Sequence, residues 1–340
     1  MNKVAIVGAG VIGRLCAIEL ADSCSIDLFD KQDLSITNAC TYTGAGMLTP
    51  YCELDNSEMS IFEMGQLSID YWQALNDQFD CGFKKSPSIV LAHQNDQSTL
   101  SMFLSGIEKK LGQNVFENLD KAALHGLEAE LTNFSSAYLS PNEAQVDNRL
   151  FIKNSSDFLA NKISFKNESV DPAELSGYDW VLDCRGLAAK DALPDLRAVR
   201  GELIYLHAPD VSIDHIVRLM HPRYPLYIVP RADDIYIIGA TQIESHDMSP
   251  PSVQSMLELL SAAYSVHSGF AEARLVDVSV NCRPAFPDNL PRVSIDNSLI
   301  RVNGLFRHGF LISPVLAQTV ADLIHGRELN NKMKEFVSVL

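Results

Sequence analysis

The sequence has 340 residues, a net charge of −16, 46% hydrophobic and 21% charged residues, which suits a globular protein large enough for two domains. Its acidity disfavours nucleic acid and anionic membranes as partners, and no apolar stretch reaches the ~18 residues of a membrane-spanning helix. The seven cysteines form no CxxC pair and the nine histidines show no HxxxH or HxH spacing, so we expect a cytoplasmic protein with neither a disulfide framework nor a metal site.

A βαβ unit opens the chain. Its parts are an apolar strand over residues 3–7, the turn Gly8-Ala-Gly10-Val-Ile-Gly13, an apolar helix over 15–20, and a strand over 25–29 that ends on Asp30. In such a unit the first glycine makes the tight turn, the second lets the backbone approach a pyrophosphate, and the third lets helix and strand pack closely. The helix N-terminus supplies N–H groups for the phosphates.

The unit predicts binding of a dinucleotide, without distinguishing FAD from NAD. The carboxylate of Asp30 can accept hydrogen bonds from both hydroxyls of an adenosine ribose, which argues against a 2′-phosphate. The alternative is a glycine-rich turn without a ligand, and that alternative leaves Asp30 unexplained.

The next part of the chain predicts a loop and several helices. Residues 38–50 are small, polar and glycine-rich, so we expect a loop that lies along the cofactor or, alternatively, a plain solvent loop. Ser60 and Glu63 have the spacing of a capping box. The helix that they would open has a four-residue apolar repeat, which predicts a buried face made of Leu67, Tyr71, Leu75 and Phe79.

Alternating short elements fill the middle of the chain. We predict strands over residues 88–92, 144–147, 163–166 and 178–184, and helices over 100–111, 119–131 and 149–160. The last of these strands runs into Arg185-Gly186. A glycine at the carboxyl end of a buried strand lies where an open α/β sheet places its ligand.

Beyond residue 198 the pattern changes to closely spaced strands. Four strands without intervening helices predict an antiparallel sheet, over residues 202–206, 216–220, 226–229 and 235–238. A helix over 251–264 and a strand over 274–280 follow. The chain ends with a strand over 299–302, a turn over 304–309 and a helix over 314–325, for which we expect Ser313 as N-cap, Pro314 at the first position and Gly326 after the end.

These elements predict an α/β protein with a discontinuous Rossmann-like FAD-binding domain of the glutathione-reductase type and a second domain built on an antiparallel sheet. We assign residues 1–83, 142–198 and 279–340 to the first domain, and residues 84–141 and 199–278 to the second, substrate-binding domain.

The sequence resembles the D-amino-acid oxidase superfamily of FAD-dependent amine oxidoreductases, and within it the glycine oxidases of thiamine biosynthesis (ThiO). The resemblance covers nearly the whole chain. The stretches that carry it are residues 7–13 (VGAGVIG), 44–48 (GAGML), 199–202 (VRGE), 226–231 (LYIVPR), 238–241 (IGAT), 283–284 (RP) and 306–314 (FRHGFLISP). The first is shared by many flavoproteins, whereas YIVPR, the later RP and the FRxG turn are together much more specific.

The resemblance implies noncovalent FAD and a set of site residues. It implies that Arg283 grips the substrate carboxylate, that Tyr227 adds a hydroxyl beside it, and that Met47 lines the pocket. A second pocket tyrosine of the family has no clear counterpart in this sequence, and Tyr224 is the candidate for it. The residues expected to contact the cofactor are Gly8, Gly10, Val11, Ile12, Gly13, Asp30, Cys40, Thr41, Gly46, Met47, Val170, Cys184, Arg185, Gly186, Arg307, His308, Gly309, Phe310 and Leu311.

Residue chemistry alone leaves alternatives for three of these residues. The guanidinium of Arg283 can bind a carboxylate with two parallel hydrogen bonds, or it can form a buried salt bridge within its sheet. By strand alternation Tyr227 is a half-buried sheet residue. His308 is expected to be a local hydrogen-bonding group, because hydride transfer to a flavin needs no protein base.

We therefore expect an enzyme that oxidises glycine or another small amine with FAD and dioxygen, giving the oxo acid, ammonia and hydrogen peroxide for thiazole synthesis in the thiamine pathway. Its partners would be the small substrate and dioxygen, with a homo-oligomer allowed. The competing hypotheses are a D-amino-acid dehydrogenase that reduces a quinone, an NAD-dependent dehydrogenase, and a flavin-binding protein without enzymatic activity.

Overall fold

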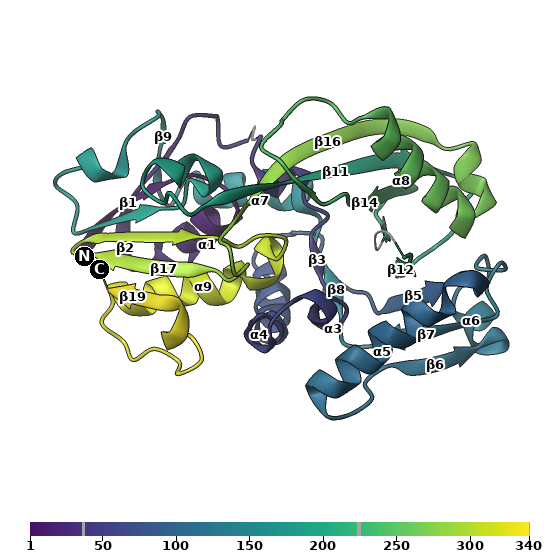
Figure 1. Ribbon diagram of the computed structural model, residues 1–340. Helices are drawn as coiled ribbons and strands as arrows, with labels where there is room; N and C mark the ends of the chain where they lie inside the picture. Colours follow the sequence, from purple (N-terminus) through teal and green to yellow (C-terminus); the bar gives the residue numbers. More distant parts are fainter. Residues whose placement is uncertain (36–37, 223–225, 340) are drawn as a thin grey trace.

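The structure, a computed structural model, describes residues 1–35, 38–222 and 226–339. Two large sheets lie side by side, with helices packed around the first and over the outer parts of the second, and the two ends of the chain lie on the side of the first sheet that faces away from the second (Figure 1). Tyr224 lies outside the described residues. This architecture confirms the predicted α/β class.

The first sheet is mostly parallel. Its strands are β1 Asn2–Val7, β2 Cys24–Asp30, β9 Ser164–Asn167, β10 Trp180–Asp183, β17 Arg292–Asp296, β18 Leu299–Asn303 and β19 Val337–Val339. In space they follow the order β19-β17-β18-β10-β1-β2-β9. Because β1, β10 and β18 are parallel neighbours, their carboxyl ends lie at one edge of the sheet, which is where an open α/β sheet binds its ligand.

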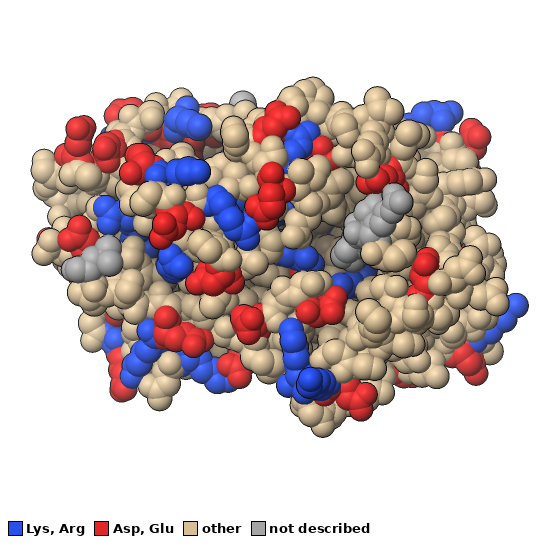
Figure 2. Space-filling model, in the orientation of Figure 1, with Lys and Arg blue, Asp and Glu red and all other residues tan. Residues whose placement is uncertain are grey.

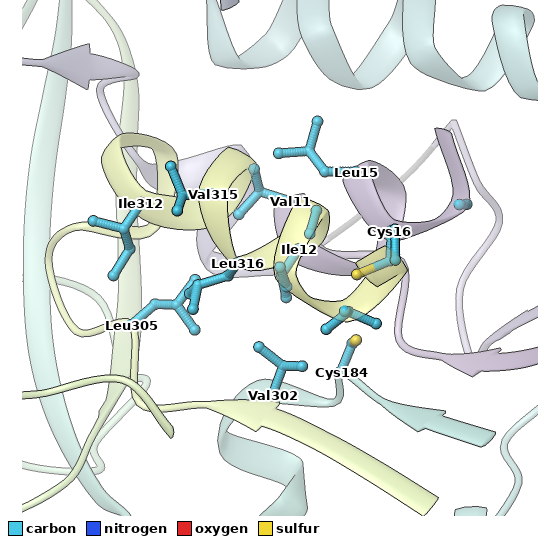
Figure 3. Close-up of a cluster of buried hydrophobic side chains, with 14 of the residues drawn as sticks. Val11, Ile12, Leu15, Cys16, Cys184, Val302, Leu305, Ile312, Val315 and Leu316 are labelled. Atoms are coloured by element: carbon cyan, nitrogen blue, oxygen red, sulfur yellow. The ribbon is translucent and has the colours of Figure 1, made fainter. Parts of the chain in front are cut away.

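Helices from distant parts of the sequence cover one face of this sheet. They are α1 Val11–Leu20, α4 Met59–Asn76, α7 Asn148–Leu159 and α9 Gly309–Ile324. Figure 3 shows α1 and α9 crossing in contact, with Val11, Ile12 and Leu15 meeting Val315 and Leu316. Burial of such side chains stabilises the fold by roughly 1.5–3 kcal/mol each, and here it joins the first turn of the chain to its last helix.

The second sheet is mixed. Its strands are β5 Ser88–Ala92, β6 Glu117–Asp120, β7 Ser136–Ser140, β11 Arg197–His207, β12 Ile216–Met220, β13 Leu226–Pro230, β14 Ile235–Gly239, β15 Ile243–Glu244 and β16 Arg274–Ala285. The antiparallel pairing predicted for the four closely spaced strands is confirmed in β11, β14, β13 and β12. The sheet then continues through β5, which is parallel to β12.

The remaining helices and short strands lie between the two sheets or, for α5, α6 and α8, pack on the second sheet. They are α2 Cys40–Thr43, β3 Met47–Leu48, α3 Pro50–Glu53, β4 Lys84–Lys85, α5 Gln97–Leu111, α6 Lys121–Leu127, β8 Ala144–Gln145 and α8 Val253–Val266. In a third sheet, β8 lies between β3 and β4. The predicted domain division, which would give each large sheet its own domain, stays a prediction.

The last helix begins earlier than the sequence predicts. It starts at Gly309 with His308 as N-cap, so Ser313 and Pro314 lie inside it, while Gly326 does follow its end with a positive φ. A proline in a helix leaves the carbonyl four residues earlier without its usual N–H partner. Here that carbonyl belongs to Phe310, and it accepts a hydrogen bond from the indole N–H of Trp72 at 2.9 Å. This tertiary contact makes an internal proline tolerable.

The predicted capping box and buried face of α4 are also wrong in part. The helix begins at Met59 without a side-chain cap, and Leu67 is 53% exposed. Its contact with α9 is made at Gly65, where an added Cβ would lie 2.8 Å from the Leu311 side chain. A pattern based on large apolar residues misses this face because its closest approach uses a glycine.

Local differences occur in two further segments. The expected loop over 38–50 contains the one-turn helix α2 and the short strand β3, and α3 begins at Pro50. The expected helix over 119–131 is instead β6 followed by α6, because the carboxylate of Asp120 caps the helix by accepting from the Ala123 N–H at 2.9 Å. Strands β4, β7, β15, β17 and β19 have no counterpart in the sequence-based prediction.

Candidate active site

The structure requires glycine at two of the three glycine positions of the first turn, but not at the third. Gly8 has φ +104, and a Cβ at Gly13 would lie 1.9 Å from the carbonyl oxygen of Gly8, so both positions are fixed by the packing of the protein itself. A Cβ at Gly10 would meet only the Thr41 hydroxyl, at 3.5 Å. The protein therefore does not require glycine at position 10, and the space beside it is free for a ligand.

The N–H groups of the same turn divide into used and free donors. That of Ala9 donates to the carboxylate of Asp30 at 2.7 Å, and that of Val11 donates to the Thr41 hydroxyl at 2.7 Å. Those of Gly10 and Ile12 make no hydrogen bond with the described residues. Unpaired backbone donors at the start of a helix form an anion site that suits a pyrophosphate.

Asp30 holds the turn as well as facing the ligand space. Its second oxygen accepts from the Gln32 N–H at 2.9 Å. An ionised carboxylate has about four lone-pair sites, so it can still accept from ribose hydroxyls. Ribose binding by Asp30 stays a prediction.

A large cavity begins at this turn and extends to the second sheet. Its volume is about 1210 Å³, more than most small-molecule pockets and enough for a dinucleotide with a substrate beside it. In Figure 2 the surface is hollowed between the two halves of the molecule, and basic side chains are visible within the hollow. All the predicted site residues line the cavity except Gly13, which packs against Gly8 instead.

The predicted residues at the end of β10 differ in their surroundings. Arg185 forms ion pairs at 2.9 Å with Asp183 and with Asp191, which raise its pKa. Gly186 has φ +59, a conformation that glycine adopts without strain.

Cys40, another residue predicted to contact the cofactor, begins α2. Its sulfur donates to the carbonyl oxygen of Cys282 at 3.2 Å.

The start of α9 supplies further free donors to the cavity. The N–H groups of Gly309, Phe310 and Leu311 make no hydrogen bond with the described residues, and these residues line the cavity. The positive end of the helix dipole stabilises negative charge placed there. This helix end can therefore bind an anionic or electron-rich ligand edge.

Arg283 is a half-buried cation without a carboxylate partner among the described residues. It lies on β16 against Gly201, where an added Cβ would be 2.3 Å from the guanidinium, and it donates to the Thr241 carbonyl at 3.3 Å. Among the described residues it forms no ion pair, so the salt-bridge alternative has no support. Burial and the nearby charge of Arg307 lower its pKa to about 10, which leaves it charged at neutral pH.

Glu53 is a site residue that sequence analysis missed. At the end of α3 it is 8% exposed, accepts from Arg307 Nε at 2.6 Å and accepts from the Tyr227 hydroxyl at 3.0 Å. Burial alone would raise the pKa of Glu53, but Arg307, His308 and Arg218 lower it to about 2. The residue is therefore ionised. A lone glutamate in an apparent loop gave no signal of these partners.

Tyr227 and Met47 lie on the wall of the cavity. Both belong to an apolar cluster with Leu203 and Val229. Burial raises the pKa of Tyr227 well above its ordinary value, so its hydroxyl keeps its proton. The tyrosine is thus both a packed sheet residue and a polar group beside the cavity.

His308 is buried and neutral. Burial lowers its pKa to about 4. Its Nδ1 lies 3.5 Å from the Glu53 carboxylate but makes no hydrogen bond among the described residues. Near neutral pH this side chain carries no charge.

The comparison with protein families settles which dinucleotide the cavity suits. The profile of the DAO family, described as FAD dependent oxidoreductase, matches residues 3–323. The chain belongs to the family of FAD-dependent oxidoreductases. As a member of this family it is an enzyme whose cofactor is FAD, and the free donors at the starts of α1 and α9, the open space at Gly10 and the carboxylate of Asp30 fit that cofactor.

This FAD-dependent oxidoreductase is similar in sequence to a ThiO protein and to a bifunctional ThiO/ThiG protein. It is 35% identical to a putative thiamine biosynthesis oxidoreductase ThiO of Rhizobium etli, over 94% of this chain and 95% of that protein. It is 24% identical to a bifunctional protein ThiO/ThiG of Synechocystis, over 98% of this chain but only 53% of that protein. The chain therefore spans about half of the bifunctional relative.

Two solved structures share the fold of this FAD-dependent oxidoreductase. Iminodiacetate oxidase from Chelativorans sp. BNC1 matches with a TM-score of 0.85 and 21% identity over 99% of both chains. Glycine oxidase from Geobacillus kaustophilus matches with a TM-score of 0.83 and 23% identity, over 99% of this chain and 98% of that chain. In the part of the chain that the structure describes, no helix has the length and apolarity to cross a membrane, and no cluster of three metal-binding side chains occurs.

Proposed function

We propose that this enzyme oxidises glycine or another small amino acid or amine to the oxo acid and ammonia, with dioxygen reduced to hydrogen peroxide, and that it serves thiamine (thiazole) biosynthesis. The observation that carries the proposal is Arg283, a half-buried guanidinium that lines the cavity and forms no ion pair within the described part of the chain. Such a cation is stabilised by a bound carboxylate. The similarity to a ThiO protein and to the glycine oxidase fold supports the same substrate class.

In this proposal the chain binds and orients while FAD supplies the redox chemistry. FAD, when bound, would supply the acceptor for the hydride lost from the substrate α-carbon. The Gly10 turn and the start of α9 would hold FAD, and Arg283 would hold the substrate carboxylate with two parallel hydrogen bonds. Two-point capture fixes the α-carbon in one orientation, which contributes to the rate by removing rotational freedom before reaction.

The proposed reaction is tested by mixing the purified holoenzyme with glycine in the absence of oxygen. We expect the flavin absorbance to bleach, and the admission of air to restore it with formation of hydrogen peroxide. Bleaching without peroxide in air would favour a dehydrogenase that uses another acceptor, such as a quinone. A flavin that none of a panel of small amino acids and amines bleaches would contradict the proposal.

The pH dependence tests whether the protein supplies a base. His308 has a pKa lowered to about 4 by burial, so it is already neutral throughout the range from about pH 6 to pH 10. Only the substrate amine then needs to lose a proton. We expect the anaerobic rate of flavin reduction at low glycine to rise with pH and to level off near an amine-like pKa.

The matched variant is His308→Asn, which keeps a hydrogen-bonding side chain and removes the imidazole. We expect its pH profile to have the same shape as that of the wild type. An additional limb near the ordinary histidine pKa of about 6.5 in the wild type, lost in the variant, would show that His308 acts as a base.

A further inference from the structure

Arg14 is a fully buried cation that directly follows the glycine turn of residues 8–13. Its side chain is 0% exposed, and within the described part of the chain it forms no ion pair. Burial lowers the pKa of Arg14 to about 10 against the opposing effect of Asp30, so the guanidinium is charged at neutral pH. Its hydrogen bonds go to neutral acceptors, which are the carbonyl oxygens of Ala9, Leu34 and Ile152 and the hydroxyls of Ser155 and Ser156. A buried charge of this kind is costly unless an anion lies near it.

One of these hydrogen bonds reaches the glycine turn from its protein side. Nε of Arg14 donates to the carbonyl oxygen of Ala9 at 2.8 Å. The nitrogen of the same peptide unit belongs to Gly10, whose N–H makes no hydrogen bond with the described residues. In a trans peptide the C=O and the N–H point in opposite directions. The cation therefore holds the oxygen end of this peptide, while the N–H end is left for a ligand.

We propose that Arg14 is a positioning residue for the pyrophosphate of FAD, because its charge fixes and polarises the Ala9–Gly10 peptide whose N–H would donate to that anion. A charged donor draws electron density toward the carbonyl oxygen, which strengthens the N–H at the other end of the peptide. The preceding N–H, that of Ala9, is held by Asp30 at 2.7 Å, so the turn is fixed on both sides of this carbonyl. The inference concerns the cofactor and does not depend on which substrate the enzyme oxidises.

The same guanidinium also joins three parts of the fold. Nη1 donates to the hydroxyls of Ser155 and Ser156 on α7, at 2.9 and 3.0 Å. Nη2 donates to the carbonyl oxygen of Leu34, in the segment that follows β2. A substitution at Arg14 is therefore expected to lower stability as well, and the experiment must distinguish this effect from the loss of the charge beside Gly10.

The test compares ADP with adenosine, which differ in the pyrophosphate group alone. The full-length protein is freed of FAD, shown to rebind it, and titrated calorimetrically with each ligand. In Arg14→Met we expect the affinity for ADP to fall about 10-fold or more, the size expected for loss of an interaction with a charged group, and the affinity for adenosine to change less than about 3-fold. The ratio of the two affinities cancels general damage to the nucleoside site, since both ligands contain the same nucleoside.

Two further substitutions separate the charge from the hydrogen bond. In Arg14→Gln the amide nitrogen is as many bonds from the backbone as Nε of arginine, so it can still donate to the Ala9 carbonyl but carries no charge. In Arg14→Lys the charge is kept and part of the hydrogen bonding is lost. We expect the ADP-to-adenosine ratio to fall about 5-fold or more in Arg14→Gln and to stay within about 2-fold of the wild type in Arg14→Lys, although both proteins melt earlier. If Arg14→Met does not fold, these two variants carry the comparison.

The control is the double variant Ser155→Ala, Ser156→Ala. It removes two hydrogen bonds of the guanidinium but leaves its charge and its contact with Ala9. We expect this variant to melt earlier than the wild type with an unchanged ratio of ADP to adenosine affinity. An unchanged ratio in Arg14→Met or Arg14→Gln would overturn the inference. So would a fall in the ratio in Arg14→Lys or in the serine variant as large as that in Arg14→Gln, because Arg14 would then act on the cofactor only through the stability of the fold.

Discussion

Replacing Arg283 by alanine is expected to lower the catalytic efficiency on glycine by two to four decades while the protein stays folded and yellow. Loss of the guanidinium removes the only cation that we assign to the substrate carboxylate. An uncompensated buried charge costs about 3–5 kcal/mol, and each 1.36 kcal/mol corresponds to about a factor of ten in rate. Anaerobic flavin reduction by glycine measures the effect.

The fold is expected to survive because Arg283 forms no ion pair with an acidic side chain in residues 1–35, 38–222 and 226–339. Its polar contact with the protein is a long hydrogen bond to the Thr241 carbonyl, at 3.3 Å. Removing a half-buried cation without a counter-charge relieves its desolvation, so the melting temperature of the enzyme without substrate should not decrease. Arg283→Lys should recover only part of the activity, since an ammonium group cannot form two parallel hydrogen bonds.

Two results would contradict this role. One is an Arg283→Ala protein that melts well below the wild type, which would mean that the guanidinium supports the fold. The other is a folded variant with nearly unchanged efficiency on glycine. In that case the carboxylate is bound elsewhere in the cavity, which Arg307, Arg185 and Lys31 also line.

Sequence analysis could identify the parts of the site that lie within one short, contiguous motif. The glycine turn and Asp30 lie within one βαβ unit, and their geometry follows from local chain sterics. Arg283 and Tyr227 came from resemblance, since strand alternation alone gave Tyr227 a structural role. The structure then brings both to one cavity, but it leaves their binding roles to experiment.

Glu53 could not be predicted in the same way. Its partners Tyr227 and Arg307 lie more than 170 residues further along the chain, and nothing near Glu53 in the sequence indicates a buried carboxylate. The predicted start of α9 was wrong for a similar reason. Pro314 is a typical first residue of a helix, and only the distant indole of Trp72 makes it acceptable in the interior.

Alanine at Gly13 is expected to destabilise the fold, whereas alanine at Gly10 is expected to impair only FAD binding, although the two glycines belong to one motif. A Cβ at Gly13 would lie 1.9 Å from a backbone oxygen, so the turn and α1 would have to separate. We expect Gly13→Ala to lower the free energy of unfolding by an amount at or above the upper end of the about 1–3 kcal/mol typical of overpacking. Without this packing the soluble protein should contain no FAD.

Gly10→Ala should leave the protein intact and impair only the cofactor. Gly10 has φ −71, which alanine adopts without strain, and its Cβ would meet only the Thr41 hydroxyl at 3.5 Å. If the pyrophosphate of FAD lies against this backbone, the added methyl group overpacks the ligand and not the protein. An overpacking of about 1–3 kcal/mol weakens FAD binding by roughly 10- to 100-fold.

The two variants are compared by melting the FAD-free proteins and by titrating each with FAD. The expected pattern is a Gly10→Ala apoprotein that melts like the wild-type apoprotein but retains FAD poorly, beside a Gly13→Ala protein that melts much earlier. Unchanged FAD affinity in Gly10→Ala would mean that the pyrophosphate does not approach this turn. In that event the free N–H groups of Gly10 and Ile12 would not be its binding site, and the assignment of the cofactor to the opening βαβ unit would be wrong.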